Sequence, residues 1–279
     1  MAKKIYNDSK IELSPAIAKH YDRIMNSISF GKYNRFIKKA VNDMQIKPGD
    51  HILDLGCGTG KNAALMAEYL GDKGKITGID LSPVMEKQFM EKHGADKRFD
   101  FKRERIDVPF DLEKQYDKVL ISFVIHGFPH EVRKALLKNA YSHLKPGGTL
   151  MILDYSEFNL DEMPWHHRFI LKSVECKYAF DYLEHDWKAI LGDHGFTGFN
   201  EKLYFRGYTR LLTGEKNGRL DRIASKEAAR RMVKVAAKAV TNSLVQETTN
   251  IIVRRMFKVV TIAETVLILR RMVKMATKP

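Results

Sequence analysis

The sequence contains little cysteine and no long apolar run, and each of these absences excludes a class of protein. Its 279 residues include only two cysteines, Cys57 and Cys176, and no C-x-x-C pair. We therefore expect neither a structural disulfide nor a cysteine-based zinc site. No window has the uninterrupted apolar length of a membrane-spanning helix, and the first residues lack the apolar segment of a signal peptide. These features predict a cytoplasmic protein.

Positive charge is concentrated in the last quarter of the chain. The net charge is +14, and residues 215–279 hold 15 Lys or Arg against 5 Asp or Glu. Residues 1–214 are nearly balanced, with 33 basic and 29 acidic residues. This asymmetry indicates an enzyme-like body with a separate basic appendage. We predict three segments: an N-terminal helical lid over 1–45, a central domain over 46–214 and a basic amphipathic helical tail over 215–279.

Strand and helix patterns alternate through the central domain. The expected strands are Ile52–Leu55, Lys75–Asp80, Phe99–Arg103, Asp117–Phe123, Thr149–Tyr155 and an antiparallel pair, Gly198–Leu203 with Tyr208–Leu212. The expected helices are Asn62–Leu70, 82–93, His130–Leu144, a mixed segment over 163–180 and His185–Gly195, and Lys145–Gly148 is expected to be a turn. This alternation predicts an α/β fold with a Rossmann-like, doubly wound, mostly parallel sheet that the antiparallel pair closes. N-terminal helices and a basic α-helical C-terminal extension complete the expected architecture.

The glycine-rich run after the first strand is the most informative motif. Gly56, Gly58 and Gly60 fall at alternate positions, and a helical pattern begins at Lys61. Glycine has no Cβ, so the backbone can turn tightly and lie close to a ligand. The spacing is G-x-G-x-G rather than the G-x-G-x-x-G of dinucleotide-binding proteins. It therefore favours S-adenosylmethionine, a nucleoside-bearing cofactor without a pyrophosphate.

Asp80 ends the second expected strand, 20 residues after Gly60. A carboxylate at this place accepts hydrogen bonds from the two ribose hydroxyls of such a cofactor. The alternative is a helix cap before Ser82 and Pro83. The order of strand, glycine loop and acid favours the ribose role.

These motifs resemble those of class I S-adenosylmethionine-dependent methyltransferases, and the chain is similar to the type that methylates carbon in ubiquinone and menaquinone biosynthesis. The resemblance covers about residues 16–214 and is carried by Tyr21-Asp22, Leu53–Gly60, Gly78–Met85 and Leu144–Leu150. It implies a methyltransferase for a lipophilic small-molecule acceptor, with quinone C-methylation first and phospholipid N-methylation second. The alternatives are a protein or RNA methyltransferase, and a cofactor-binding protein that serves assembly through its tail.

The resemblance also implies an adenine site after the third strand. The stretch from Arg103 to Phe110 departs from the usual pattern of the family. By its position, Glu104 is the acid that meets the adenine amino group, with Asp107 as the runner-up. The alternative for Glu104 is a solvated surface charge. The backbone amides of Arg105 and Ile106 are expected to face the adenine ring.

The methionine part of the cofactor is assigned in the same way. The resemblance implies that Asp54 orients the amino group, that Ser122 and Phe123 border the methionine chain, and that Tyr21 belongs to a lid. The full set of implied cofactor-binding residues is Tyr21, Asp54, Gly56, Cys57, Gly58, Gly60, Asp80, Leu81, Met85, Glu104, Arg105, Ile106, Ser122 and Phe123.

His126 is the candidate for the catalytic base, if the acceptor must lose a proton. It follows the fourth strand, at the edge where such sheets bind ligands, and an unperturbed pKa of about 6.5 suits proton transfer. The alternative is a histidine that shapes the pocket wall. Met163–Tyr182 is either the acceptor site or plain core. We expect no metal, because His166 and His167 have no third ligand at a recognisable spacing.

The tail contains an internal repeat of the form Arg-Arg-Met-x-Lys, which begins at Arg230, Arg254 and Arg270. Helical spacing places the basic residues of each copy on one face. Basic amphipathic helices bind anionic membrane surfaces, so we expect residues 219–279 to place the enzyme on the inner face of the membrane. Homo-oligomerisation or packing through the apolar face is the alternative. Nucleic acid is a less favoured partner, because no stacking surface accompanies the basic residues.

Overall fold

The computed structural model of the chain describes residues 32–218 continuously, together with residues 5, 6, 8–10, 17, 18, 20, 23 and 234. The chain divides into two compact units, Met1–Asn217 and Gly218–Pro279. The predicted helical tail, apart from residues 215–218 and Lys234, and about half of the predicted lid, including Tyr21, lie outside the described residues. The division into three segments therefore stays a prediction.

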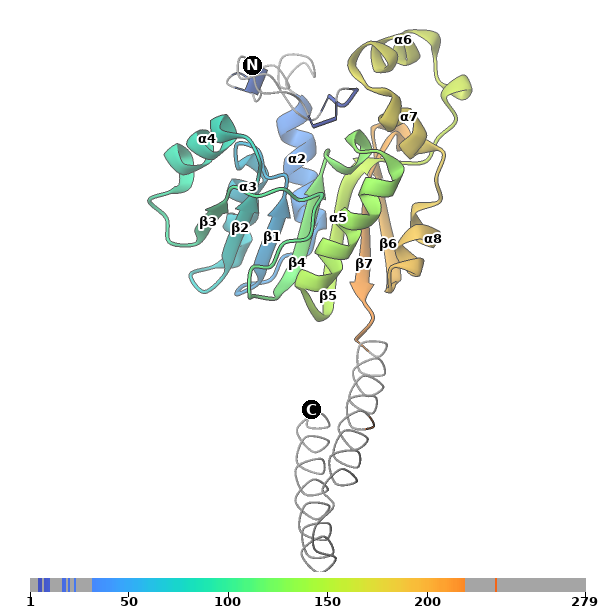
Figure 1. Cartoon of the computed structure of the whole chain (residues 1–279). Coiled ribbons are helices and arrows are strands. Elements are labelled where there is room, and N and C mark those ends of the chain that lie inside the picture. Colours follow the sequence, from blue (N-terminus) through green and yellow to red (C-terminus); the bar gives the residue numbers. More distant parts are fainter. Residues whose placement is uncertain are drawn as a thin grey trace, which may run out of the picture. The chain divides into compact units, whose positions relative to one another are not determined.

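A seven-stranded sheet forms the centre of the first unit (Figure 1). Its strands are β1 (His51–Leu55), β2 (Lys75–Ile79), β3 (Phe99–Lys102), β4 (Tyr116–Ser122), β5 (Leu144–Tyr155), β6 (Phe196–Tyr204) and β7 (Thr209–Lys216). Their spatial order is β3-β2-β1-β4-β5-β7-β6. The first five strands pair in parallel, and β7 pairs antiparallel with both β5 and β6. The predicted mostly parallel sheet with a closing antiparallel pair is confirmed.

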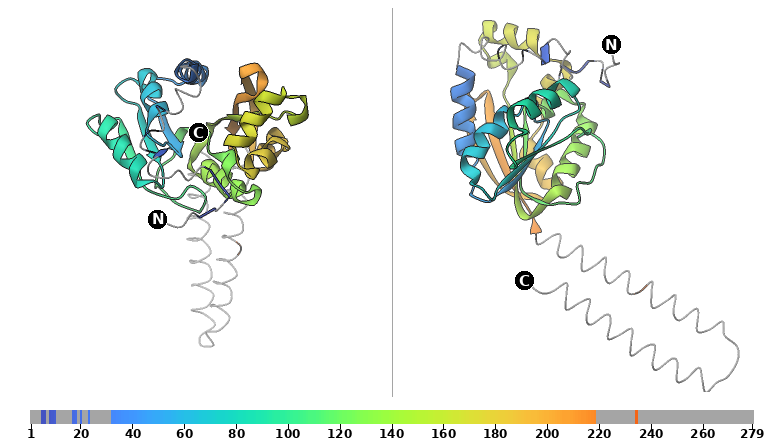
Figure 2. Two further views of the ribbon diagram at one scale, coloured as in Figure 1. Left: turned by 90° about the horizontal axis from the view of Figure 1, so that it is seen from above. Right: turned by 90° about the vertical axis from the view of Figure 1, so that its left-hand side faces the viewer.

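Helices cover both faces of this sheet (Figures 1 and 2). One face carries α2 (Lys32–Asp43), α3 (Lys61–Leu70) and α4 (Pro83–His93). The other carries α5 (His130–His143), α7 (Lys177–Leu183) and α8 (Trp187–Asp193). The remaining elements are α6 (Trp165–Val174) and the 3-10 turns η1 (Ile125–Gly127), η2 (Leu160–Glu162) and η3 (Phe205–Gly207). None of the helices in the described part combines the length and hydropathy needed to cross a membrane.

The position of β1 in the sheet explains why its sequence is almost continuously apolar. Successive side chains of a strand point to opposite faces, and both faces of this strand are covered. Ile52 packs in the cluster that includes Met66 of α3, whereas Leu53 and Leu55 pack in the cluster that includes Leu136 of α5. A parallel strand buried on both sides reads as an apolar run for this reason.

Three local predictions differ from the structure. The strand β5 begins at Leu144, so the expected turn over Lys145–Gly148 is part of an irregular strand with Gly147 at φ +78°. The mixed segment over 163–180 is broken at Glu175, whose backbone is extended. Strand β7 runs to Lys216, beyond the expected end at Leu212, because its backbone stays paired with β6 as far as Phe196 and with β5 as far as Thr149.

Candidate active site

The candidate site lies where β1 and β4 run side by side. Chain connections leave these two strands toward opposite faces of the sheet, which opens a crevice at their carboxyl ends. The loop after β1 packs against the segment after β4: a Cβ added at Gly56 would lie 2.6 Å from Cγ2 of Val124. Only glycine lets the two segments approach this closely. The G-x-G-x-G spacing is therefore partly a packing requirement.

The glycine loop is fixed on one side and open on the other. The backbone N–H groups of Gly56 and Cys57 both donate to the carbonyl of Ile79, at 2.8 and 3.0 Å, which ties the loop to the end of β2. Gly58 adopts φ +54°, and a Cβ built there meets no atom within 4 Å. The loop therefore presents an unobstructed backbone at Gly58, as the close approach of a ligand requires.

Asp80 connects the glycine loop to the start of α4. Its two carboxylate oxygens accept the backbone N–H of Gly58 at 3.0 Å and that of Ser82 at 2.8 Å. Burial raises the pKa of Asp80, and these backbone hydrogen bonds only partly oppose the rise. The N-cap of α4 is Ser82, whose hydroxyl accepts from Met85 N–H. Asp80 is therefore not the helix cap, and ribose binding stays a prediction for it.

Asp54 is a buried carboxylate without a hydrogen-bond partner in the described part of the chain. The residue is 1% exposed, and neither of its oxygens receives a donor from another described residue. Burial and the neighbouring charge of Asp80 raise the pKa of Asp54 to about 7. Buried polar groups are normally paired, so this carboxylate fits a ligand that brings a cationic group. The amino group and sulfonium of S-adenosylmethionine supply positive charge of that kind.

The two candidates for the adenine contact differ in their surroundings. Asp107 is buried, and its carboxylate is already paired with the Arg105 guanidinium at 2.6 Å and with the Tyr6 hydroxyl at 2.7 Å. Glu104 is exposed, and no other described residue hydrogen-bonds its carboxylate. Ile106 is buried, and its carbonyl accepts from the Asn139 amide at 2.8 Å. This environment favours Glu104 over the runner-up, and the adenine contact stays a prediction.

His126 is buried between two carboxylates. Its Nδ1 lies 2.7 Å from Oδ1 of Asp154, and its Nε2 lies 3.5 Å from Oε2 of Glu175. The Tyr155 hydroxyl donates to the other oxygen of Glu175 at 2.7 Å. Burial alone would lower the pKa of His126, but the two carboxylates raise it to about 10.

This arrangement bears on the role of His126 as a base. At neutral pH the ring is protonated and both nitrogens face acceptors, so no lone pair is free to take a proton. The geometry favours the alternative from the sequence, a histidine that shapes the site. The catalytic assignment remains an untested prediction.

The other sequence-predicted residues lie around the same edge. Phe123, the residue directly after β4, has φ +52°, which is strained for a bulky side chain. Its N–H donates to Leu153 O at 2.9 Å, next to Asp154. Cys57 and Met85 are buried, whereas Leu81 is 43% exposed and offers an apolar surface beside Asp80. The remaining predicted positions in the described part, Ser122 and Gly60, flank these residues in β4 and at the start of α3.

Sequence reasoning missed the carboxylates that surround His126. Asp154 had a detectable signal, since it follows an apolar run near the end of its strand, at the same sheet edge as Asp54 and Asp80. No sequence signal pointed to Glu175, because only the break between α6 and α7 brings its carboxylate to the ring of His126.

The fold and this site define a class I S-adenosylmethionine-dependent methyltransferase. The chain belongs to the ubiE/COQ5 methyltransferase family, whose sequence model matches residues 4–175. The enzyme therefore uses S-adenosylmethionine as its methyl donor.

Curated relatives and solved structures agree with this assignment. The chain is 29% identical over 181 residues to a demethylmenaquinone methyltransferase of Listeria welshimeri, covering 61% of this chain and 74% of that one. It is 31% identical over 185 residues to the chloroplastic 2-phytyl-1,4-beta-naphthoquinone methyltransferase of Arabidopsis thaliana, covering 64% and 69%. An S-adenosylmethionine-dependent methyltransferase from Aquifex aeolicus shares the fold with a TM-score of 0.52 and 18% identity, covering 74% of this chain and 100% of that one. Human N-acetylserotonin methyltransferase shares it with a TM-score of 0.54 and 18% identity, covering 73% and 56%.

Proposed function

We propose that the protein methylates a ring carbon of a lipophilic, quinone-type acceptor that it takes from a membrane surface. The relatives named above methylate demethylmenaquinone and a phytyl naphthoquinone, as their names state. The observation that carries the proposal for this chain is an exposed apolar helix, α6, connected directly to the candidate site.

The donor half of the reaction rests on three groups of this chain. S-adenosylmethionine supplies an electrophilic methyl group on a positively charged sulfur. The unpaired Asp54 carboxylate would hold the cationic part of this donor, and Asp80 would bind the ribose beside the open backbone at Gly58. Fixing the donor in this way leaves the alignment of the acceptor as the main task of the enzyme.

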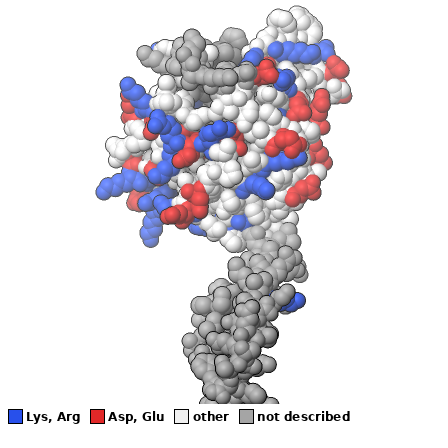
Figure 3. Space-filling model, viewed as in Figure 1, with Lys and Arg blue, Asp and Glu red and all other residues white. Residues whose placement is uncertain are grey.

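The acceptor half rests on α6. Its apolar side chains face solvent instead of the core: Trp165 is 75% exposed, Phe169 68% and Ile170 54%. In Figure 3 the surface at the position of α6, at the upper right, is largely uncharged, with basic and acidic side chains along its lower edge. An exposed apolar patch of this kind marks a partner, membrane or ligand site, and aromatic side chains beside cations suit a lipid interface.

The end of α6 enters the candidate site. Glu175, the C-cap of α6, contacts both His126 and Tyr155. A cavity of about 610 Å³ lies beside the start of the helix and is lined by Pro164, His166, His167, Phe205, Arg206 and Tyr208. The helix therefore spans from an apolar outer surface to the charged network at the carboxyl edge of the sheet.

Methylation of a ring carbon forms a carbon–carbon bond, breaks the sulfur–methyl bond to leave S-adenosylhomocysteine, and then releases the ring proton to water. His126 is paired with two carboxylates and does not serve as the acceptor of that proton in the arrangement seen here. We propose instead that it is a positioning residue, which holds Glu175 and thereby the end of α6.

The tail is proposed as a second membrane contact, from its sequence alone. Residues 219–279, apart from Lys234, lie outside the described residues, so the repeats at Arg230, Arg254 and Arg270 carry this part. Each Lys or Arg near an anionic surface adds about 1 kcal/mol of attraction.

The experiment incubates the full chain with labelled S-adenosylmethionine and three acceptors: a prenylated 1,4-naphthoquinol, the same head group without its chain, and phosphatidylethanolamine. We expect label on the ring carbon of the prenylated substrate. In a Trp165→Ser, Phe169→Ser double variant, KM for the prenylated acceptor should rise at least tenfold, with little change for the short one. Leu203→Ser, at a 58% exposed position of β6, is the matched control. Label on the phospholipid, or an equal loss for both quinols, would contradict the proposal.

The membrane role of the tail is tested separately by vesicle sedimentation. A full-length variant carries glutamine in place of the arginines and lysines of the three repeats. We expect the parent chain to sediment with anionic vesicles and the variant to stay largely in the supernatant. Equal binding of both proteins would exclude the repeats as the membrane contact.

A further inference from the structure

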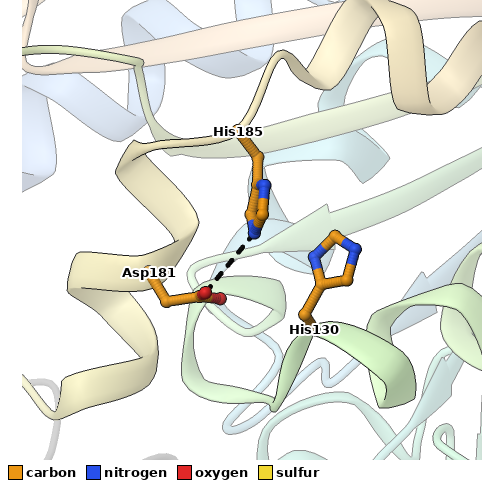
Figure 4. A group of neighbouring side chains, drawn as sticks. All are labelled: His130, Asp181 and His185. Atoms are coloured by element: carbon orange, nitrogen blue, oxygen red, sulfur yellow. Dashed lines mark ion pairs between the residues drawn. The ribbon is translucent and has the colours of Figure 1, made fainter.

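Three side chains that belong to none of the predicted sites converge at the start of α5. His130 is the first residue of α5, Asp181 lies in α7, and His185 follows α7 before α8 begins. Figure 4 shows the three side chains directed toward a common point. One nitrogen or oxygen atom of each lies within 4.8 Å of the other two. The two imidazole rings are 4.1 Å apart between centroids.

The histidines present buried nitrogens that have no hydrogen-bond partner in the described part of the chain. These atoms are Nδ1 of His130 and Nε2 of His185. Nε2 of His185 lies 3.4 Å from Oδ1 of Asp181, close enough for an ion pair but without hydrogen-bond geometry. A buried ring nitrogen without a partner loses the hydrogen bond it would make to water. Two such nitrogens beside one carboxylate oxygen offer a metal ion three ligand atoms.

The carboxylate of Asp181 is held in place from the other side. Its Oδ2 accepts from Nη1 of Arg133 at 2.7 Å, which leaves Oδ1 toward the histidines. Arg133 is fully buried and also donates to the carbonyls of Ile125 and His126, each at 3.2 Å. Carboxylates that bind metals are commonly oriented by a hydrogen bond of this kind.

We propose that His130, Asp181 and His185 bind one divalent transition-metal ion of the Zn²⁺ type, through two imidazole nitrogens and one carboxylate oxygen. Water would be the fourth ligand of a tetrahedral site. Imidazole suits zinc, cobalt, nickel and copper, whereas magnesium and calcium prefer oxygen ligands. The sequence alone gave no sign of this site, because His130 and Asp181 are 51 residues apart and meet only through the packing of α7 on α5.

The bound ion would act as a clamp. It would join the first turn of α5 to α7 and to the segment before α8, next to the guanidinium that holds η1. Helix α7 follows Glu175, the residue that reaches His126, so the clamp would fix the chain on the acceptor side of the candidate site.

The test uses the metal-free full chain and Zn²⁺ in competition with a chromogenic chelator, with Co²⁺ as a spectroscopic probe. We expect one tightly bound ion per chain and the visible absorption of four-coordinate Co²⁺. His130→Gln and His185→Gln should each weaken Zn²⁺ binding by at least about tenfold. His166→Gln, which removes an exposed histidine from α6, is the matched control and should leave the affinity unchanged. Excess Mg²⁺ should not compete.

Thermal unfolding distinguishes lost binding from lost folding. We expect Zn²⁺ to raise the Tm of the parent chain and of His166→Gln, but not that of His185→Gln, since a ligand stabilises only the state it binds. Asp181→Asn keeps an oxygen for Arg133 and serves as a further variant if a histidine variant does not fold. Zn²⁺ affinity equal in the parent chain and in these variants would mean that the three residues form an ordinary ion pair, and would overturn the proposal.

Discussion

The imidazole Nδ1 of His126 lies 2.7 Å from the carboxylate of Asp154, and both side chains are buried. A short contact with a buried carboxylate favours the charged form of the imidazole ring. The ring is thus a permanent cation at neutral pH, which changes the role expected for it and makes the stability of the protein depend on pH.

We expect the free energy of unfolding to fall as the pH rises from about 6.5 to about 10. The pKa of His126 is raised to about 10 in the folded chain, against about 6.5 when unfolded. The stabilisation is complete below pH 6.5 and is lost as the pH rises through the folded pKa. Urea unfolding between pH 6 and 10 measures this slope.

His126→Gln is the variant that tests this assignment. The substitution leaves Asp154 buried without its cation, which should cost about 3 to 5 kcal/mol at pH 6.5, and the slope between pH 6.5 and 10 should flatten. If His126 is instead the catalytic base, the methylation rate of the parent chain will rise with pH through about 6.5, and the variant will lack this rise.

Asp54→Asn should stabilise the folded chain while weakening its hold on S-adenosylmethionine. Burial and the charge of Asp80 raise the pKa of Asp54 to about 7, so its stabilising protonated form is lost as the pH rises from about 4 through about 7. The amide removes this penalty, and Tm at pH 8 should rise. The amide also removes the counter-charge for the donor, so Kd should increase at least tenfold.

Calorimetric titration with S-adenosylmethionine at pH 6.0 and 7.5 provides the sharper comparison. In the parent chain the affinity should increase several-fold with pH as Asp54 ionises, and the variant should show a much smaller change. Unchanged affinity in Asp54→Asn would remove this carboxylate from the donor site.

Gly56→Ala and Gly58→Ala should show two different reasons for glycine in this loop. Gly56 is required for packing, whereas Gly58 is required for the close approach of the cofactor. A methyl group at Gly56 meets Val124 at 2.6 Å on a backbone with φ +79°, so this variant should lose about 2 to 4 kcal/mol of stability. Gly58 faces open space, and alanine there should cost only about 1 to 2 kcal/mol. We expect Gly58→Ala to fold but to bind S-adenosylmethionine weakly. Calorimetry and thermal unfolding of both variants decide this, and normal cofactor binding by Gly58→Ala would contradict it.

Glu104→Gln should weaken the binding of S-adenosylmethionine, whereas Asp107→Asn should lower the stability of the folded chain. Asp107 is paired with Arg105 and Tyr6, which lower its pKa against the effect of burial, so its loss should mainly lower stability. Glu104 is exposed and should affect only the adenine contact, with a several-fold rise in Kd and an unchanged Tm. Competition with adenosine locates the effect. A larger binding loss in Asp107→Asn at full stability would reverse the assignment.

The sheet was predictable because its signals are local. The apolar run of β1, the glycines that follow it and the acid at the end of β2 are fixed by backbone geometry within a few residues. The predicted order of strands and helices therefore agrees with the structure. The errors occur where contacts between residues far apart in the chain decide the local structure. Glu175 is an example: α6 ends there, and its side chain contacts His126 and Tyr155.

The sequence by itself determined the class of enzyme and its methyl donor, because short-range motifs carry both, and it predicted the edge of the sheet where the donor would bind. Tertiary structure decided the charge state of His126, since that state depends on carboxylates 28 and 49 residues away in the chain. It also decided the convergence of His130, Asp181 and His185. Burial and the electric field of neighbouring groups are properties of packed side chains, and the order of residues along the chain does not contain them until the helices are in place.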